Sequence, residues 1–306
     1  MEVGEWTVDR EWIATPELNS IYREIRSLGL ETNLAELEAF GFTTIRDALS
    51  KETVERARTA ILDTAEARVG RKLDLQSEGQ LAEVASGREV AGQHYLLYKD
   101  QVFEQIVLNP KPLALITYLL GYSCWLSSLY SHVKGPGEVG LLLHSDTANG
   151  VPAPFSAYSH VANCNYALTD YTEASGCLAI VPGSHRLHRQ PTSWEIHLAG
   201  NERNPHAVPV EVPAGTAIVW HGNTWHGSFP RKMPGLRINL AAYYCRQYMA
   251  PQELYGRKAP DEILDRHGRD SRMAQLLGLN HFNGWQDEGP DLDNRFSMPA
   301  GRTWQS

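Results

Sequence analysis

Cys124-Trp-Leu-Ser-Ser-Leu-Tyr-Ser-His-Val133 is the first of eight short runs that read as β-strands. The turn signal Gly135-Pro136-Gly137 follows it closely, and similar Gly/Pro/Asn signals separate the later runs. The other seven runs are Glu138–His144, His160–Thr169, Gly176–Val181, Ala207–Val212, Ala217–Trp220, His226–Phe229 and Leu236–Tyr244. Many short strands with such turns indicate an antiparallel barrel or jelly roll, and not alternating strands and helices.

The segments on both sides of this β region read as helical. Earlier helices are expected over Pro16–Ser27, Leu34–Phe40, the residues after Ser50, Asp100–Leu108 and Pro112–Leu120, with an early strand at Phe40–Ile45. Later helices are expected over Pro260–His267 and Ser271–Leu279, before a tail rich in Gly, Pro and Asp. No repeat and no linker is visible, so we predict one domain over 1–306. It comprises an N-terminal helical region (1–122), the core (123–248) and a C-terminal helical extension (249–306).

The composition is that of an ordinary globular protein. Of the 306 residues 42% are hydrophobic and 21% are charged, which excludes disordered and collagen-like classes. The formal net charge is −8 and no long basic run occurs, so we expect no nucleic-acid partner. No apolar stretch reaches the roughly 18–20 residues that a membrane span needs. The four cysteines form no CxxC pair, which predicts buried thiols in a reduced, cytoplasmic protein.

His144-Ser145-Asp146 could present two metal ligands. Residues two apart on a strand point to the same face, so the imidazole and the carboxylate could bind one ion. His226, in Trp225-His-Gly-Ser228, would add a second imidazole. Two histidines and one carboxylate suit a non-haem Fe(II) oxygenase, and zinc could use the same ligands. His221 is the nearest rival ligand, but strand alternation places it on the opposite face from His226.

Arg237 lies on the apolar strand Leu236-Arg-Ile-Asn-Leu240, where a buried guanidinium would need an anion. No acidic residue is near it in the sequence. If the strands on either side of Pro230–Gly235 form a hairpin, Ser228 lies opposite Arg237. Both could then hold a ligand carboxylate. The alternative is an arginine on a sheet edge that faces solvent.

Taken together, these motifs resemble the phytanoyl-CoA dioxygenase family. The residues that carry the resemblance are His144-x-Asp146, Gly176-Cys-Leu-Ala-Ile-Val-Pro-Gly-Ser-His185, and Trp225-His-Gly-Ser228 followed by Arg237, within about 38–247. The resemblance implies a mainly β fold with flanking helices around a double-stranded β-helix (a jelly-roll, cupin-like core). It also implies an enzyme that uses Fe(II), 2-oxoglutarate and O2 and releases succinate and CO2.

The resemblance also assigns roles to residues of this chain. His144, Asp146 and His226 would bind iron, Arg237 and Ser228 would hold the distal carboxylate of 2-oxoglutarate, and Asn165 would face this cosubstrate. Leu141-Leu-Leu143 departs from the family, which often has a polar residue, commonly glutamine, close to this strand. Thr216 stands where the family usually has aspartate. Asp146 is retained, which disfavours halogenation.

The loop Thr147–Ser159 directly follows the metal-ligand motif, and small and apolar residues dominate it. We expect it to roof the pocket and to favour a small, largely apolar substrate that is hydroxylated at an unactivated C–H bond. Pro182-Gly-Ser-His185 reads as a structural corner. The alternative function is a zinc-binding or catalytically inactive jelly-roll protein that acts as a hydrolase, an isomerase or a ligand-binding module. A homo-oligomer is compatible with the sequence.

Overall fold

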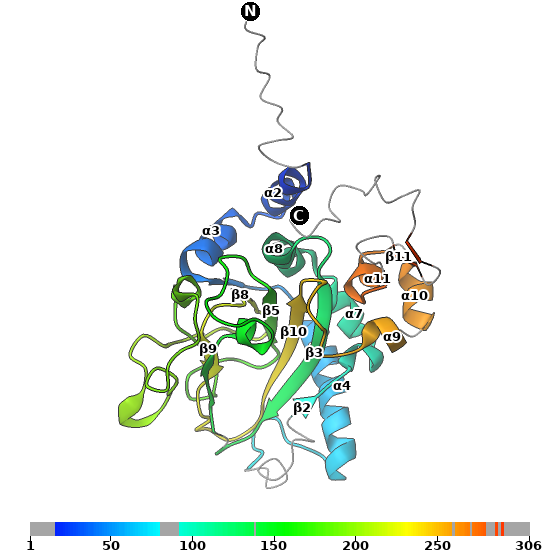
Figure 1. The fold of residues 1–306 in the computed structure, drawn as a ribbon. Helices are drawn as coiled ribbons and strands as arrows, with labels where there is room; N and C mark the ends of the chain where they lie inside the picture. The colour runs from blue at the N-terminus through cyan, green and yellow to red at the C-terminus, as the bar shows by residue number, and fades with distance from the viewer. Residues whose placement is uncertain are drawn as a thin grey trace, which may run out of the picture.

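Two antiparallel sheets form the core of the computed structural model (Figure 1), which describes residues 16–79, 92–137, 139–258, 261–269, 271–279, 285–286 and 289–290. The six-stranded sheet has the order β1-β8-β5-β10-β3-β2, and the four-stranded sheet has the order β4-β9-β6-β7. Their strands are β1 (Phe42–Ile45), β2 (Gly92–Gln93), β3 (Trp125–Lys134), β4 (Leu141–His144), β5 (Val161–Ala167), β6 (Leu178–Ile180), β7 (Val208–Pro209), β8 (Ala217–His221), β9 (His226–Ser228) and β10 (Arg237–Cys245). The predicted mainly β, jelly-roll architecture is therefore confirmed.

Helices cover the outer face of the six-stranded sheet. They are α2 (Pro16–Ser27), α3 (Glu31–Phe40), α4 (Lys51–Val69), α7 (Val102–Val107) and α8 (Pro110–Leu120), with α9 (Tyr255–Lys258), α10 (Asp261–His267) and α11 (Arg272–Leu276) at the C-terminal side (Figure 1). The expected N-cap of α4 is present, because the Ser50 hydroxyl accepts a hydrogen bond from the Thr53 N–H at 3.1 Å. β11 (Trp285–Gln286) and β12 (Gly289–Pro290) form a separate hairpin in the tail, most of which lies outside the described residues.

Alternation along the strands of the large sheet divides its residues between two cores. Side chains such as Leu129, Tyr166 and Leu240 face the helices and belong to the large helix-covered core. Ile218 and Trp220 pack into a second apolar cluster with residues of β4 and β6 and with Trp225 and Phe229, which flank β9, so this cluster lies between the two sheets. One part of the barrel interior is therefore filled by this apolar cluster. The inward-facing residues outside the cluster could line a functional site.

The strand register fixes which inward-facing residues lie side by side on the large sheet. Trp220, Asn163, Tyr243 and Ser128 form one row across β8, β5, β10 and β3. Ile218, Asn165, Ala241 and Tyr130 form the row two residues further along each strand. Arg237 and Lys134 are paired at the far end of β10 and β3.

The expected hairpin between β9 and β10 is wrong. β9 pairs with β4 and β6 in the small sheet, whereas β10 pairs with β3 and β5 in the large one. The chain between them therefore crosses from one sheet to the other at Pro230–Gly235. Ser228 is opposite Leu141 and Leu178, not opposite Arg237.

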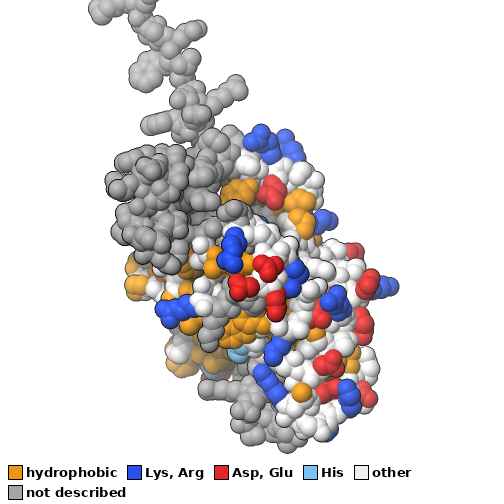
Figure 2. Space-filling view, turned by 90° about the vertical axis from the view of Figure 1, so that its right-hand side faces the viewer, with side chains coloured by type: hydrophobic (Ala, Val, Ile, Leu, Met, Phe, Trp, Pro, Cys, Tyr) orange, Lys and Arg blue, Asp and Glu red, His pale blue; other side chains and the backbone are white. Residues whose placement is uncertain are grey.

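The structure shows the surroundings of the four cysteines and the charge on one face of the molecule. On the face shown in Figure 2, acidic and basic side chains of the described residues are interspersed and form no extended basic patch. Cys124, Cys164, Cys177 and Cys245 are all buried free thiols. Among the described helices, none is both long enough and apolar enough to cross a bilayer.

Candidate metal centre

The two predicted histidine ligands come from neighbouring strands of the small sheet. His144 ends β4 and His226 begins β9, and the two residues are paired directly in the register. The His144 Nδ1 is 2.9 Å from the Leu142 carbonyl oxygen, and the His226 Nδ1 is 3.0 Å from that of Thr224. Because a carbonyl can only accept, each Nδ1 carries the proton and each Nε2 keeps its lone pair for a metal.

Asp146 completes the cluster from the other side. One carboxylate oxygen, Oδ1, lies 3.5 Å from the His144 Nε2, and Oδ2 lies 3.4 Å from the His226 Nε2. The ligand atoms of the three residues all lie within 4.8 Å of one another, and no other group of this kind occurs among the described residues. We expected Asp146 and His144 to lie on one strand with their side chains on the same face, but Asp146 is not on the strand that carries His144. It begins the short 3-10 helix η2 (Asp146–Asn149), which turns its carboxylate toward β9.

The charge states around the centre suit a divalent cation. Burial favours the neutral acid, but the neighbouring His226 and His144, together with a hydrogen bond from Asn163, lower the pKa of Asp146 to about 2. Burial lowers the pKa of His226 to about 4, so this imidazole is neutral at neutral pH. For His144, burial acts in the same direction, but the contact with Asp146 outweighs it and raises the pKa.

The Gly176–His185 motif holds β9 in place. Its central strand β6 pairs with β9, with Ile180 opposite His226. The Ser184 hydroxyl accepts a hydrogen bond from the Trp225 N–H at 2.8 Å and donates one to the Val181 carbonyl at 2.6 Å. The motif therefore fixes the strand that carries His226, in agreement with its interpretation as a structural corner.

Arg237 lies inside the barrel with 5% of its surface exposed, so the interpretation as a solvent-facing edge arginine is wrong. Its Nε is buried and has no hydrogen-bond partner in the described part of the chain. The guanidinium lies 5.3 Å from the centre of the Tyr171 ring, and the Tyr171 hydroxyl contacts the Asn165 Oδ1 at 3.4 Å. Asn165 and Arg237 therefore adjoin the same aromatic ring within the barrel.

Ser228 faces this region from the small sheet. The Lys134 ammonium donates hydrogen bonds to the Ser228 hydroxyl and to the Phe229 carbonyl, both at 3.0 Å. Lys134 is the register partner of Arg237. Lys134 therefore links Ser228 to the end of the large sheet that carries Arg237, in place of the hairpin that the sequence suggested.

His221, His185 and the loop over Thr147–Ser159 lie near the site without belonging to the His144/Asp146/His226 cluster. His221 and His185 are not part of the His144/Asp146/His226 cluster, and the centres of their rings lie 5.6 Å apart. The loop over Thr147–Ser159 packs on the segment after β8, where the Thr147 hydroxyl bonds to the Asn223 side chain at 2.7 Å. Sequence reasoning missed Asn163, Tyr171 and Lys134. The only available signal for Asn163 was its spacing of two from Asn165 on an otherwise apolar strand.

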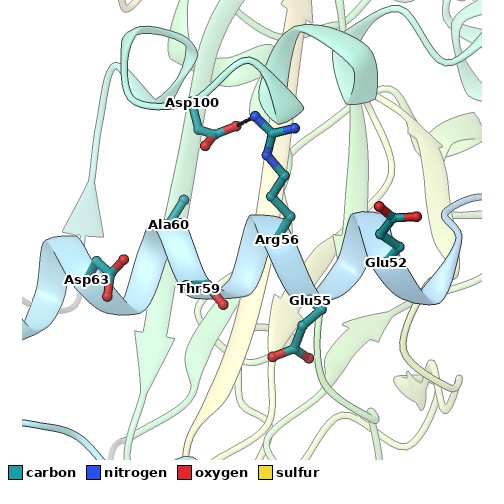
Figure 3. Close-up of a pocket in the computed structure, with 7 residues that line it drawn as sticks. All are labelled: Glu52, Glu55, Arg56, Thr59, Ala60, Asp63 and Asp100. Carbon is teal, nitrogen blue, oxygen red and sulfur yellow. Dashed lines mark ion pairs between the residues drawn. The ribbon is translucent and has the colours of Figure 1, made fainter.

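A separate groove of about 420 Å³ lies on the outside of the molecule, over α4 (Figure 3). Glu52, Glu55, Asp63 and Asp100 line it, and Arg56 forms an ion pair with Asp100 at 2.8 Å. None of these residues belongs to the barrel interior, so the groove is distinct from the candidate metal centre.

A jelly roll that gathers two histidines and one carboxylate inside its barrel defines the class of non-haem Fe(II) oxygenases. Comparison with known proteins agrees. The family model for phytanoyl-CoA dioxygenase (PhyH) matches residues 37–238. The chain is 28% identical to dioxygenase af480 of Aspergillus fumigatus over 257 residues, covering 84% of this chain and 79% of that one. It is 24% identical to dioxygenase aneA of Aspergillus aculeatus, covering 88% and 91%.

Solved structures show the same fold. HygX from Streptomyces hygroscopicus, solved with nickel and 2-oxoglutarate, superposes with a TM-score of 0.57 at 15% identity, over 72% of this chain and 88% of that one. EctD from S. alaskensis gives 0.56 at 19% identity, over 71% and 76%.

The chain belongs to the phytanoyl-CoA dioxygenase family. Membership confirms the predicted class of enzyme, an Fe(II)- and 2-oxoglutarate-dependent dioxygenase, and with it the predicted cofactors iron, 2-oxoglutarate and O2.

Proposed function

We propose that this dioxygenase hydroxylates an unactivated C–H bond of a small, largely apolar molecule, with His144, Asp146 and His226 as iron ligands. Arg237 and Ser228 bind the distal carboxylate of 2-oxoglutarate, and Asn165 faces this cosubstrate. The observation that carries the proposal is the buried guanidinium of Arg237, whose Nε lacks a partner among the described residues in the same barrel as the His/Asp/His cluster. An anion that enters this barrel would satisfy it, because a carboxylate matches the planar donors of arginine.

The protein residues bind and orient the reactants. The Nε2 atoms of the two histidines and the ionised carboxylate would hold a ferrous ion and would leave its remaining positions for 2-oxoglutarate and O2. Iron and 2-oxoglutarate, when bound, would supply together with O2 the oxidising chemistry that breaks a substrate C–H bond. Asn165, Ala241 and Tyr130 form one inward row of the large sheet, and this row lies between the His144/Asp146/His226 cluster and Arg237. No residue needs to act as a general base in this scheme.

An apolar substrate is supported by the residues on the other side of the metal cluster. Val161, Tyr243 and Cys245 form a small buried cluster against which Trp125 and Met249 pack. Tyr243 is the register neighbour of Asn163, so this cluster begins directly beside the residue that holds Asp146. Aromatic and apolar side chains at this position favour a substrate of similar chemistry.

The test is conversion of 2-oxoglutarate to succinate by the purified protein, with Fe(II) or Zn(II) added and with metal removed by chelation. We expect conversion with iron only. Asp146→Ala and His226→Ala should abolish it, because each removes a ligand, whereas His185→Ala should retain most of it. Equal loss in all three variants would contradict the ligand assignment, and activity with zinc would favour the alternative metal. Oxygen-dependent gain of 16 mass units in a screen of apolar metabolites would identify the substrate.

A further inference from the structure

Asn163 contacts the carboxylate of the candidate metal centre and belongs to no motif of the sequence. It lies on β5, is 4% exposed, and has bonded strands on both sides. Its Nδ2 donates a hydrogen bond of 2.6 Å to the Asp146 Oδ2. Within the part of the chain that the structure describes, this is the one hydrogen bond from a side-chain amide to that carboxylate.

The two oxygens of Asp146 are therefore not equivalent. Oδ2 accepts the short hydrogen bond from Asn163, which occupies one of its lone-pair directions. Oδ1 faces the His144 Nε2 at 3.5 Å and Oδ2 faces the His226 Nε2 at 3.4 Å, but only Oδ2 also accepts a hydrogen bond from the amide. Oδ1, which accepts no hydrogen bond from Asn163, is therefore the oxygen that would bind an ion placed between the two imidazoles.

The surroundings of Asn163 make this orientation rigid. Its register neighbours are Trp220 on β8 and Tyr243 on β10, so large rings flank it on both sides. The Trp220 ring also lies 4.9 Å from the His226 ring. One row of the sheet therefore supports both the carboxylate and one imidazole, since Trp220 packs on His226 while Asn163 bonds Asp146.

We propose that Asn163 is a positioning residue that makes Asp146 a one-oxygen ligand of the metal. The inference rests on the proposed function, in which Asp146 binds iron. A carboxylate that bound through both oxygens would occupy a fourth coordination position and would leave fewer for 2-oxoglutarate. By holding Oδ2, Asn163 keeps the open side of the ion available. Partners of metal ligands of this kind typically contribute 10–100-fold to metal affinity.

The experiment compares Asn163→Leu with Asn165→Leu, which removes the other inward amide of the same strand. The dissociation constant for Co(II) is measured on metal-free protein without 2-oxoglutarate, and that for 2-oxoglutarate is then measured on Co(II)-loaded protein without oxygen. We expect Asn163→Leu to weaken Co(II) binding about 10–100-fold. Asn165→Leu should leave Co(II) binding within about twofold of wild type and weaken 2-oxoglutarate binding.

Folding is monitored by the melting temperature of the metal-free proteins, and Asn163→Ala replaces Asn163→Leu if leucine is not accommodated. Unchanged Co(II) affinity in the Asn163 variant, or an equal loss in Asn165→Leu, would overturn the inference. Failure of the wild-type protein to bind one equivalent of metal would instead refute the proposed function, so the two failures are distinguishable.

Discussion

Arg231 and Arg237 are equally buried, with 5% of each exposed, but they differ in their partners. Arg231 donates to the backbone carbonyls of Gly235, Ser175 and Pro234 at 2.6–3.0 Å, so its role is to hold the crossover between the sheets. Arg237 leaves its Nε without a partner among the described residues. A buried polar group without a partner costs free energy, and a ligand that satisfies it recovers that cost.

Arg237→Ala should raise the 2-oxoglutarate concentration needed for half-maximal turnover about 10- to 100-fold. A hydrogen bond to a charged group contributes ~1.5–3 kcal/mol, which corresponds to roughly that range. Steady-state kinetics with varied 2-oxoglutarate measure the effect. Arg231→Ala is the matched control and should lower the melting temperature while the requirement for 2-oxoglutarate stays near that of wild type. An unchanged requirement in Arg237→Ala would remove its assigned role.

The sequence predicted six site residues but gave no prediction for Asn163. His144, Asp146 and His226 stand in short motifs whose spacing is itself a chemical signal, and the structure brings them together. Asn163 contacts Asp146, and Tyr171 contacts Asn165 and Arg237, through side chains on different strands and loops. Such contacts depend on strand register, which one sequence does not display.

β9 is bonded on both sides, and the glycine between its two functional residues permits this. A Cβ on Gly227 would lie 2.3 Å from the Leu141 carbonyl oxygen and 3.0 Å from that of Leu142, both backbone atoms of β4, the strand that ends with His144. The close approach of β4 to β9 therefore requires glycine, and this approach pairs His144 with His226.

Gly227→Ala should lower the free energy of unfolding by about 1–3 kcal/mol, the usual cost of forcing a group into a filled space. It should also weaken metal binding, because β4 must move away from β9 and separate the two imidazoles. Chemical denaturation and metal titration measure the two effects. Gly79→Ala is the control, since a Cβ there meets no atom within 4 Å. Wild-type values for Gly227→Ala would show that the strands tolerate the separation.

At the level of elements, the sequence predicted strands better than it predicted their partners. All eight strands after Cys124 are present, because alternation and turn residues are local properties. The hairpin of β9 with β10 was wrong because the six residues Pro230–Gly235 connect two different sheets. A short connection favours a hairpin only when both strands stay in one sheet.

The stability of the whole protein should depend on the neutral state of His221. Burial, together with repulsion from His185, lowers the pKa of this histidine to about 3. The His221 Nδ1 accepts a hydrogen bond from the Asn223 N–H, which requires the neutral ring. In the unfolded chain the ordinary value is 6.5. Between pH 6.5 and 3 the unfolded state therefore binds more protons, so the stability falls as the pH falls.

We expect the free energy of unfolding to decrease by up to about 1.4 kcal/mol per pH unit in this window because of His221. His221→Asn, which keeps a neutral acceptor, should show a shallower dependence between pH 6.5 and 4.5. Urea denaturation at several pH values measures both slopes, and the difference between the two proteins isolates the histidine from other groups. Parallel slopes would contradict the prediction.

His226 and Ser228 lie on one face of β9 with Gly227 between them, so the strand fixes the distance between these two residues. Two residues of an extended strand span roughly 7 Å, and the pairing of β9 with β4 and β6 keeps that length from changing. If a diacid bridges the ion and the Ser228–Arg237 region, the backbone itself selects its chain length. Keto-diacids one methylene shorter or longer than 2-oxoglutarate would then be rejected by the spacing of the peptide units, independently of their charge.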